Sequence, residues 1–334
     1  MTHGQQSTAA ALRAAGARSV VEDPDVRREA LHALRRTPKT LPAKFFYDEA
    51  GARLFEQICT LEEYYLPRAE LEILRARAAE IATLAGPRAA LVEYGSGAGV
   101  KVRVLLEALV QPVAYVPIDI SGEQLERVAA ELRSDYPALL VHPVRADFTA
   151  PLVLPAATPR ARRIAFFPGS TIGNFHPADA VAFLRRVRMT VGHDGALVLG
   201  LDRRKDEHVL HAAYNDAAGV TAAFNLNMLA RLNREAAATF DVARFRHRAF
   251  FNSAESRIEM HLESLEHQTV GVGGVPIEFA RGETIWTESS YKYDRERLDR
   301  LVSAAGFSLT RLWSDAREQF WVAFLSVAND TPVR

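Results

Sequence analysis

Cysteine is nearly absent from this sequence, since Cys59 is the only one among 334 residues. A single thiol excludes a disulfide within the chain and a zinc site built on cysteines. Histidine is more frequent, with ten residues, but none has the H-E-x-x-H or H-x-H spacing of metal ligands. We therefore expect no bound metal.

An excess of charge and a long apolar run are also missing. Lys plus Arg and Asp plus Glu are 41 each, so the net charge is zero and lacks the basic excess of a general nucleic-acid binder. No apolar run reaches about 18 residues, and no hydrophobic signal core is present, which argues against a membrane span or export. We expect a cytoplasmic protein without nucleic-acid or membrane partners, and a monomer.

The composition is that of a globular protein, with 48% hydrophobic and 25% charged residues. In its middle part, apolar strand-like segments alternate with segments of helical spacing. Strands are expected over 90–97, 114–120, 139–148, 162–170 and 195–202, and helices over 101–110, 121–137 and 176–192, the second with Ser121 as its N-cap. This alternation predicts an α/β fold: a doubly wound parallel sheet with helices on both faces.

The alternation stops after Asp202. Residues 205 to about 250 look helical, residues 256–280 and TIWTESSYKY alternate like strands, and a helix and a hairpin end the chain. We expect a flexible tail over 1–20, a discontinuous α+β substrate-binding lobe from 21–68 and 204–292, and the sheet domain from 69–203 and 293–330.

A glycine-rich turn, VEYGSGAG, follows the first strand of the sheet domain. Gly95, Gly97 and Gly99 allow a tight turn and a close approach of the backbone to a ligand. Val100 occupies the place of the third glycine of the G-x-G-x-x-G dinucleotide pattern, and Lys101 follows it. This mismatch weakens the prediction of a nicotinamide cofactor without excluding it, because a helix N-terminus at this place still favours an anion.

Acidic residues end the next two strands. Asp119 lies 22 residues after Gly97, where a carboxylate reaches ribose hydroxyls, and Asp147-Phe148 suit an adenine amino group and ring. Each acid alone is equally consistent with a helix N-cap. Together with E-x-G-x-G-x-G they resemble the S-adenosylmethionine-dependent methyltransferase pattern, and they favour a methyl donor over a nicotinamide.

The stretch IAFFPGSTIGNF makes the resemblance specific. With LPAKFFYDEAGARLFEQICTLEEYYLPRAE before it, and AAYNDAAGVTAAFNLNMLARLNRE and TESSYKY after it, the chain resembles the L-histidine Nα-methyltransferase family from about Leu41 to the final hairpin. That family makes hercynine, the trimethylated betaine of histidine, in ergothioneine biosynthesis. The resemblance implies a class I methyltransferase, Rossmann-like sheet domain, S-adenosylmethionine as methyl donor and histidine bound between two lobes.

The resemblance also assigns roles to residues. Asn174 and Tyr214 would hold the carboxylate and amino end of histidine, and Glu288 and Ser290 would hydrogen-bond the imidazole. The remaining residues of the substrate cavity would be Tyr47, Phe55, Tyr64 and Met260. The cofactor would be held by Gly95, Ser96, Gly97, Lys101, Asp119, Asp147 and Phe148.

These residue types suit the chemistry. A small polar substrate is selected by buried groups that are left unpaired with a wrong amino acid. Methyl transfer needs alignment of an unprotonated amine with the methyl carbon, and the Tyr47 phenol is our candidate for accepting the amine's hydrogen bond. Aromatic walls would favour the methylated, cationic intermediates through cation–π contacts.

Other interpretations stay open for individual residues. Phe55 and Met260 have the spacing of core residues, Asn174 suits a turn, Tyr214 a packed tyrosine and Glu288 an exposed edge strand. For the whole chain the alternatives are an α-N-methyltransferase for another amino acid such as tryptophan, a nicotinamide-dependent oxidoreductase, and an inactive binding protein.

Overall fold

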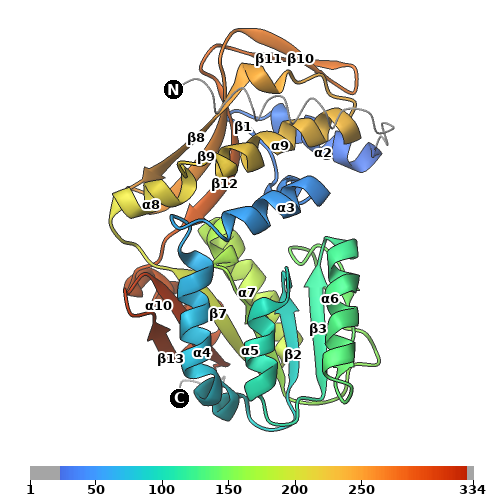
Figure 1. Cartoon of the computed structure of the whole chain (residues 1–334), viewed down its shortest axis with the longest axis vertical. Helices are drawn as coiled ribbons and strands as arrows, with labels where there is room; N and C mark the ends of the chain where they lie inside the picture. The colour runs from blue at the N-terminus through green and yellow to red at the C-terminus, as the bar shows by residue number, and fades with distance from the viewer. Residues whose placement is uncertain (1–22, 329–334) are drawn as a thin grey trace, which may run out of the picture. The chain divides into compact units, whose positions relative to one another are not determined.

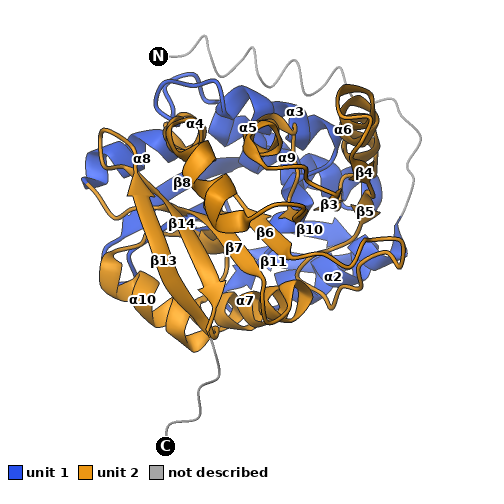
Figure 2. Ribbon diagram, turned by 90° about the horizontal axis from the view of Figure 1, so that it is seen from below, with its two compact units in different colours: residues 1–64, 206–289 blue, residues 65–205, 290–334 orange. Residues whose placement is uncertain are grey.

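The structure is a computed structural model that describes residues 23–328 (Figure 1). The tail expected over residues 1–20 lies outside the described residues. The chain forms two compact units, coloured separately in Figure 2. Unit 1 comprises Met1–Tyr64 and Asp206–Ser289, and unit 2 comprises Tyr65–Lys205 and Ser290–Arg334.

Unit 2 contains an eight-stranded sheet in the order β13-β14-β7-β6-β2-β3-β4, with β5 also paired to β3. Its strands are β2 (Ala90–Tyr94), β3 (Ala114–Asp119), β4 (Leu140–Val141), β5 (Val144–Arg145), β6 (Arg163–Phe167), β7 (Ala196–Asp202), β13 (Phe307–Ser314) and β14 (Phe320–Val327). Neighbouring strands from β4 to β7 are parallel, whereas β14 runs antiparallel to β7 and β13. The strand order reverses between β2 and β6, which is the position where open α/β sheets bind ligands.

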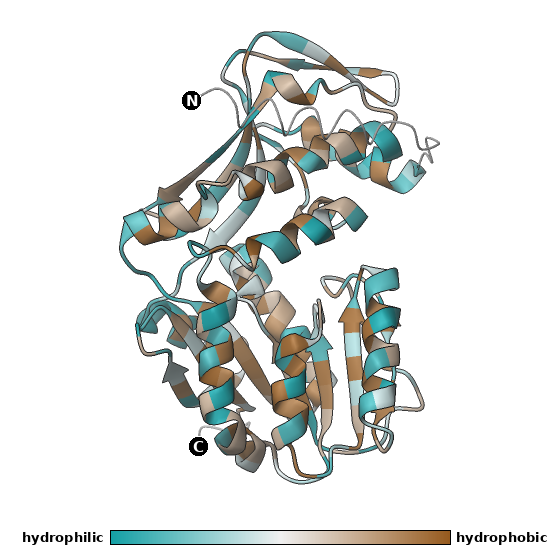
Figure 3. Ribbon diagram, viewed as in Figure 1, coloured by the Kyte–Doolittle hydropathy of each residue, from teal (hydrophilic) through white to brown (hydrophobic). Residues whose placement is uncertain are grey.

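Helices cover both faces of this sheet. The helices α4 (Leu66–Ala85), α5 (Val100–Ala108) and α6 (Gly122–Asp135) lie on one face, and α7 (Pro177–Val191) and α10 (Arg295–Ala304) on the other (Figures 1 and 2). Figure 3 shows both hydrophobic and hydrophilic residues on α4, α5 and α6, as expected of amphipathic helices. The predicted doubly wound, class I methyltransferase-like fold is therefore confirmed.

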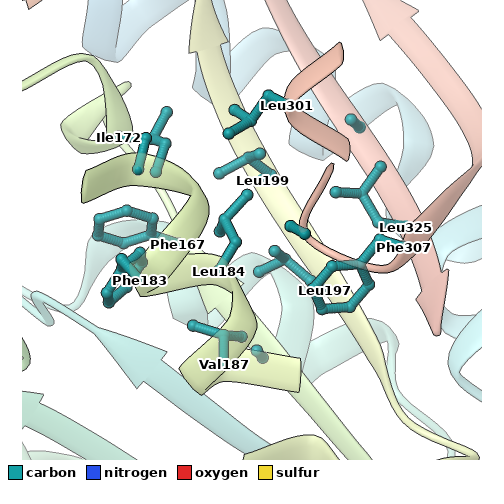
Figure 4. Close-up of a cluster of buried hydrophobic side chains, with 14 of the residues drawn as sticks. Phe167, Ile172, Phe183, Leu184, Val187, Leu197, Leu199, Leu301, Phe307 and Leu325 are labelled. Atoms are coloured by element: carbon teal, nitrogen blue, oxygen red, sulfur yellow. The ribbon is translucent and has the colours of Figure 1, made fainter. Parts of the chain in front are cut away.

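A large apolar core lies between the sheet and α7 and α10 (Figure 4). Leu197 and Leu199 on β7 are two residues apart and point to the same face, where they join Phe183, Leu184 and Val187 of α7. Burying each such side chain stabilises the fold by about 1.5–3 kcal/mol. This core fixes the carboxyl ends of the strands, and with them the loops that follow.

Unit 1 combines helices with two small sheets. Its elements are α2 (Pro24–Leu34), β1 (Lys39–Thr40), the 3-10 helix η1 (Ala43–Phe46), α3 (Glu49–Ile58), α8 (Glu207–Tyr214), α9 (Val220–Glu235), the 3-10 helix η3 (Val242–Arg244), β8 (Phe245–Asn252), β9 (Arg257–Ser264), β10 (Gln268–Val272), β11 (Val275–Phe279) and β12 (Thr284–Tyr291), whose last two residues belong to unit 2. One sheet has the order β1-β12-β9-β8, and β10 and β11 form a separate antiparallel pair. The helices begin at clear signals: Asp23 accepts hydrogen bonds from two backbone N–H groups of α2, and Asp48 caps α3.

Two local expectations were wrong, and a third was confirmed in position only. The helical stretch expected to about residue 250 ends earlier, because Phe245–Asn252 forms β8. The third strand of the parallel sheet is broken into β4 and β5, with His142 and Pro143 between them. Ser121 is at the N-cap of α6, but its side chain makes no capping hydrogen bond; the turn is held instead by its N–H, which donates to Asp119 Oδ1.

Candidate functional site

The turn from β2 to α5 depends on glycine conformations. Gly95, Gly97 and Gly99 all have left-handed φ values, of +77°, +49° and +72°. A Cβ atom on Gly99 would also lie 2.7 Å from Cγ1 of Val128 on α6, so no side chain fits there. The turn therefore exposes backbone at the end of β2 and lets α5 begin close to α6.

Asp119 joins two of the loops at this edge of the sheet. Its Oδ2 accepts a hydrogen bond from the Gly97 N–H at 3.3 Å, and its Oδ1 accepts one from the Ser121 N–H at 2.9 Å. Ser96, between the glycines, is 5% exposed, and its Oγ has no hydrogen-bond partner within residues 23–328. A buried hydroxyl of this kind fits a bound polar ligand, since buried polar groups in proteins are normally paired.

The structure brings Phe148 to the same turn. A Cβ atom on Gly95 would lie 3.7 Å from the Phe148 ring, which packs against Tyr94, Phe167 and Phe183 with centroids 5.7–6.4 Å apart. Asp147 Oδ1 accepts hydrogen bonds from the N–H and Oγ1 of Thr149. The expected cofactor residues from β2, β3 and the loop after β5 thus converge at one edge of the sheet.

Lys101 has a partner that sequence reasoning missed. Its Nζ lies 2.5 Å from Oε2 of Glu70, which is on α4 and fully buried. Glu70 also accepts a hydrogen bond from the Gly169 N–H at 2.9 Å, in the loop after β6. A Cβ atom on Gly200 would come within 2.2 Å of Glu70, so only glycine fits at this position of β7. A glycine inside a strand is a sequence signal that another group packs closely against the strand.

Glu93, the acidic residue that begins the glycine-rich motif, is a buried carboxyl group. Burial raises its pKa to about 8, against the opposing effects of the Tyr115 hydroxyl, 2.5 Å from Glu93 Oε2, and of Lys101. The folded protein therefore keeps a proton on Glu93 at neutral pH.

Replacing Glu93 with glutamine should remove a pH dependence of stability. Between about pH 5 and 8 the wild type binds a proton that the unfolded chain has lost, so its free energy of unfolding falls with rising pH. The free energy of unfolding of Glu93→Gln, relative to that of the wild type, should therefore increase by about 1.4 kcal/mol per pH unit in that window. Urea unfolding at several pH values measures this, with Glu107→Gln on the exposed side of α5 as control; parallel profiles of wild type and Glu93→Gln would contradict it.

The loop after β6, residues 168–174, is held at both ends. Ser170 has a left-handed φ of 59°, and its Oγ accepts a hydrogen bond from the Asp202 N–H at 2.8 Å. A Cβ atom on Gly173 would lie 2.8 Å from the Tyr291 carbonyl oxygen. The loop ends in the 3-10 helix η2 (Thr171–Asn174), whose last residue, the predicted substrate ligand Asn174, is half-buried.

A cluster of buried charged side chains contacts this loop through the hydrogen bond from the Asp202 N–H to Ser170 Oγ. Asp202 and Lys292 are both fully buried, with Lys292 Nζ 2.8 Å from Asp202 Oδ2 and 2.9 Å from Oγ of Ser290. Asp202 also accepts a hydrogen bond from the Tyr65 hydroxyl at 2.8 Å and pairs with Lys205. Burial lowers the pKa of Lys205 to about 8 against the attraction of Asp202. Burial alone would raise the pKa of Asp202, but the two lysines hold that pKa below its usual value.

Unit 1 brings four of the predicted substrate residues into one aromatic cluster. Tyr47 contacts Phe55 (5.8 Å between centroids), Phe55 contacts Tyr64 (6.3 Å), and Tyr64 contacts Tyr214 (6.1 Å). Phe224 on α9 lies 5.9 Å from both Tyr47 and Phe55, and sequence reasoning did not single it out. An apolar residue of an amphipathic helix gives no signal that separates it from ordinary core.

Glu288 acts on this cluster electrostatically. Burial raises the pKa of Tyr64 well above its usual value, and Tyr214, Cys59, Glu288 and Tyr47 raise it further. A carboxylate accepts several hydrogen bonds, so a ligand with N–H donors is chemically compatible with it. Met260 is buried in the same unit, and its carbonyl oxygen accepts a hydrogen bond from Thr287 Oγ1 at 3.0 Å.

Two kinds of feature are absent from the described part of the chain. Over residues 23–328, no helix is long and apolar enough to cross a membrane. In the same residues, no group of three or more His, Cys, Asp or Glu side chains has a geometry that could hold a metal ion.

Comparison with known proteins identifies the family. The family model described as "Histidine-specific methyltransferase, SAM-dependent" matches residues 26–327. The chain is 42% identical to the histidine N-alpha-methyltransferase of Mycobacterium tuberculosis over 301 residues, which cover 88% of this chain and 92% of that protein. It is also 31% identical to ergothioneine biosynthesis protein 1 of Neurospora crassa, over 84% of this chain and 32% of that protein.

A relative with another named substrate is more distant. The chain is 28% identical to the L-tryptophan methyltransferase of Psilocybe serbica, over 94% of this chain and 96% of that protein. The match of the family model to nearly the whole chain and the 42% identity agree with the class I sheet order and the glycine-rich turn. The chain therefore belongs to the family of S-adenosylmethionine-dependent, histidine-specific methyltransferases.

Proposed function

We propose that this protein transfers three methyl groups from S-adenosylmethionine to the α-amino nitrogen of L-histidine, giving hercynine for ergothioneine biosynthesis. The observation that carries the choice of substrate is the position of Glu288, whose charge raises the pKa of Tyr64 in the aromatic cluster of unit 1. An imidazole N–H offers this carboxylate a hydrogen bond, whereas an apolar amino acid side chain offers none.

The residues at the edge of the unit 2 sheet fit the proposed cofactor. The left-handed glycines give close access to the backbone, and the unpaired Ser96 hydroxyl offers a polar contact. Asp119 would accept hydrogen bonds from ribose hydroxyls, and Asp147 and Phe148 would take the adenine. Lys101, held by Glu70, would bring a positive charge toward the anionic carboxylate of the cofactor.

When bound, S-adenosylmethionine supplies an electrophilic methyl group on a sulfonium. The new bond joins that carbon to the histidine nitrogen, the carbon–sulfur bond breaks, and each methylation of an N–H releases one proton. Asn174 and Tyr214 would hold the carboxylate and amino end, because an amide offers both a donor and an acceptor. The Tyr47 phenol would accept a hydrogen bond from the amine. This contact would orient the lone pair of the amine nitrogen away from the Tyr47 ring.

The aromatic cluster suits the later methylations. The mono- and dimethylated intermediates are cations when protonated, and the faces of Tyr47, Phe55 and Tyr64 would attract them. We further propose that the protein works in the cytoplasm as a monomer, needs no metal, and binds neither nucleic acid nor membranes.

Mass spectrometry tests the function directly. The purified protein is incubated with S-adenosylmethionine and each of the twenty amino acids, and we expect a gain of three methyl groups on histidine alone. The second candidate, an α-N-methyltransferase for another amino acid, is favoured by the similarity to the tryptophan enzyme and would give a different methylated product. Absence of any product would refute both.

Replacing Asn174 with alanine should separate substrate binding from cofactor binding. The variant loses the amide at the end of η2, whereas the glycine turn and Asp119 are untouched. We expect the KM for histidine to rise by about 10-fold or more, as for loss of a hydrogen bond to a charged group, with the Kd for S-adenosylmethionine nearly unchanged. Steady-state kinetics and calorimetry measure the two constants, and unchanged kinetics would leave Asn174 as a structural turn residue.

A further inference from the structure

Glu70 is a fully buried carboxylate at the edge of the unit 2 sheet where the expected cofactor residues converge. Its Oε2 accepts a hydrogen bond from Lys101 Nζ at 2.5 Å, and its two oxygens lie 3.1 and 2.9 Å from the Gly169 nitrogen, whose N–H they accept. Gly200 on β7 leaves room for this side chain, because a Cβ atom there would lie 2.2 Å from Glu70 Oε1. The Glu70 carboxylate is therefore fixed by contacts with α5, β7 and the loop after β6.

The Lys101 ammonium is only partly satisfied by this contact. An ammonium group has three N–H donors, and over residues 23–328 Glu70 is the one hydrogen-bond acceptor of Lys101. The Lys101 side chain is 22% exposed, whereas that of Glu70 is 0% exposed. A Cβ atom on Gly169 would lie 3.7 Å from Lys101 Nζ, so the ammonium also lies close to the loop after β6. The pair thus presents its positive end to solvent and keeps two donors for an anion.

An anchored lysine binds an anion differently from a mobile one. A mobile lysine loses rotamer freedom when it contacts a ligand, and this loss lowers the affinity by a factor of about 10. Glu70 imposes the order before a ligand arrives, so that factor is absent from the binding equilibrium. Glu70 itself repels an anion, but the anion would contact Lys101 directly and the buried Glu70 only at a longer distance, so the attraction is the larger effect.

We propose that Glu70 is a positioning residue that fixes Lys101 as the receptor for the carboxylate of the cofactor's amino acid part. The inference rests on the cofactor site proposed above, and it adds the residue that makes the site selective for a carboxylate. Lys101 is in the first turn of α5, which follows directly on the glycine turn with the buried, unpaired Ser96 hydroxyl. The protein therefore distinguishes S-adenosylmethionine and S-adenosylhomocysteine from related nucleosides that lack the carboxylate.

A double-mutant cycle with two ligands tests the inference, using Glu70→Gln, Lys101→Met and the two combined. Calorimetry measures the Kd of S-adenosylhomocysteine and of its decarboxylated analogue, which keeps the nucleoside, the sulfur and the amine. In the wild type we expect the carboxylate to improve the Kd by about 30-fold, as for a hydrogen bond between charged groups. This carboxylate factor should fall to about threefold in Glu70→Gln, and to less than about twofold in Lys101→Met and in the combined variant.

The other outcomes of this cycle overturn the proposal. An unchanged or larger carboxylate factor in Glu70→Gln would make Glu70 a bystander or a competing anion. Equal weakening of both ligands would show that Glu70 supports the structure of the whole site. If the wild type binds neither ligand, the proposed cofactor site fails and this inference with it, whereas equal Kd values for the two ligands in the wild type refute the inference alone. The identity of the methylated amino acid does not enter the test.

Glu72→Gln is the matched control. It makes the same change two residues further along α4, where Glu72 is exposed and accepts a hydrogen bond from the Ala316 N–H at 2.9 Å. Its carboxylate factor should stay within about twofold of that of the wild type. A fall as large as that in Glu70→Gln would assign the effect to the charge of the helix and overturn the role of Glu70.

Lysine-selective NMR of the unliganded wild type provides a second test that does not depend on the folding of variants. We expect the Lys101 ammonium to have a high order parameter before any ligand is added, and to change little when S-adenosylhomocysteine binds. Lys44, whose side chain is 36% exposed and paired with Glu29, is the mobile reference. A Lys101 side chain that is as mobile as Lys44 in the free protein, and is ordered only by the ligand, would overturn the proposal.

Discussion

Replacement of Glu288 with alanine should raise the KM for histidine by about 10- to 100-fold and leave the KM for S-adenosylmethionine within about twofold. The reason is that the imidazole loses its proposed hydrogen-bond acceptor: Glu288 belongs to unit 1, and its charge raises the pKa of Tyr64 in the aromatic cluster. An imidazole N–H that is removed from water without an acceptor loses the hydrogen bond it made to solvent. Steady-state kinetics with each substrate varied in turn measures the two constants.

A matched control for this variant is Glu278→Ala. Glu278 is an exposed glutamate of the same unit, on β11, whose carboxylate accepts a hydrogen bond from Thr269. This variant should have the kinetics of the wild type. If Glu288→Ala instead raises both KM values by the same factor, Glu288 supports the structure and does not read the imidazole.

The second large effect is expected at Asp119. Its two oxygens hold the Gly97 and Ser121 backbones, and in the proposed complex they accept from the ribose hydroxyls. Asp119→Ala should raise the Kd for S-adenosylmethionine by about 100-fold, since two charge-assisted hydrogen bonds are lost. Calorimetric titration measures this, and the thermal stabilisation by saturating S-adenosylmethionine should shrink in parallel.

Two further variants sharpen the test of Asp119. Asp119→Asn keeps one acceptor oxygen and should fall between the wild type and the alanine variant. Asp135→Ala, at the end of α6, removes a surface carboxylate that pairs with Arg103, and should leave the Kd unchanged. An unchanged Kd in Asp119→Ala would show that this carboxylate serves only to hold the two loops.

The periodic part of the fold could be predicted from the amino-acid sequence. The β2–α5–β3–α6 alternation, the strands β6 and β7 and the final hairpin follow from apolar periods and turn residues, which are local properties of the chain. The glycine turn, the two acids and the FFPGSTIGNF stretch are local as well, and they are enough to indicate the family. Strand β8 could not be predicted in this way, because FRHRAFFN carries too many charged residues for a clear strand pattern, and its pairing with β9 decides it.

Which polar residues act together depends on the tertiary structure. Glu70 and Lys101 are 31 positions apart, and Asp202 and Lys292 are 90 apart, so no local pattern connects them. Burial turns these ordinary charged residues into fixed partners, because a charge removed from water is stable only beside an opposite charge or a donor.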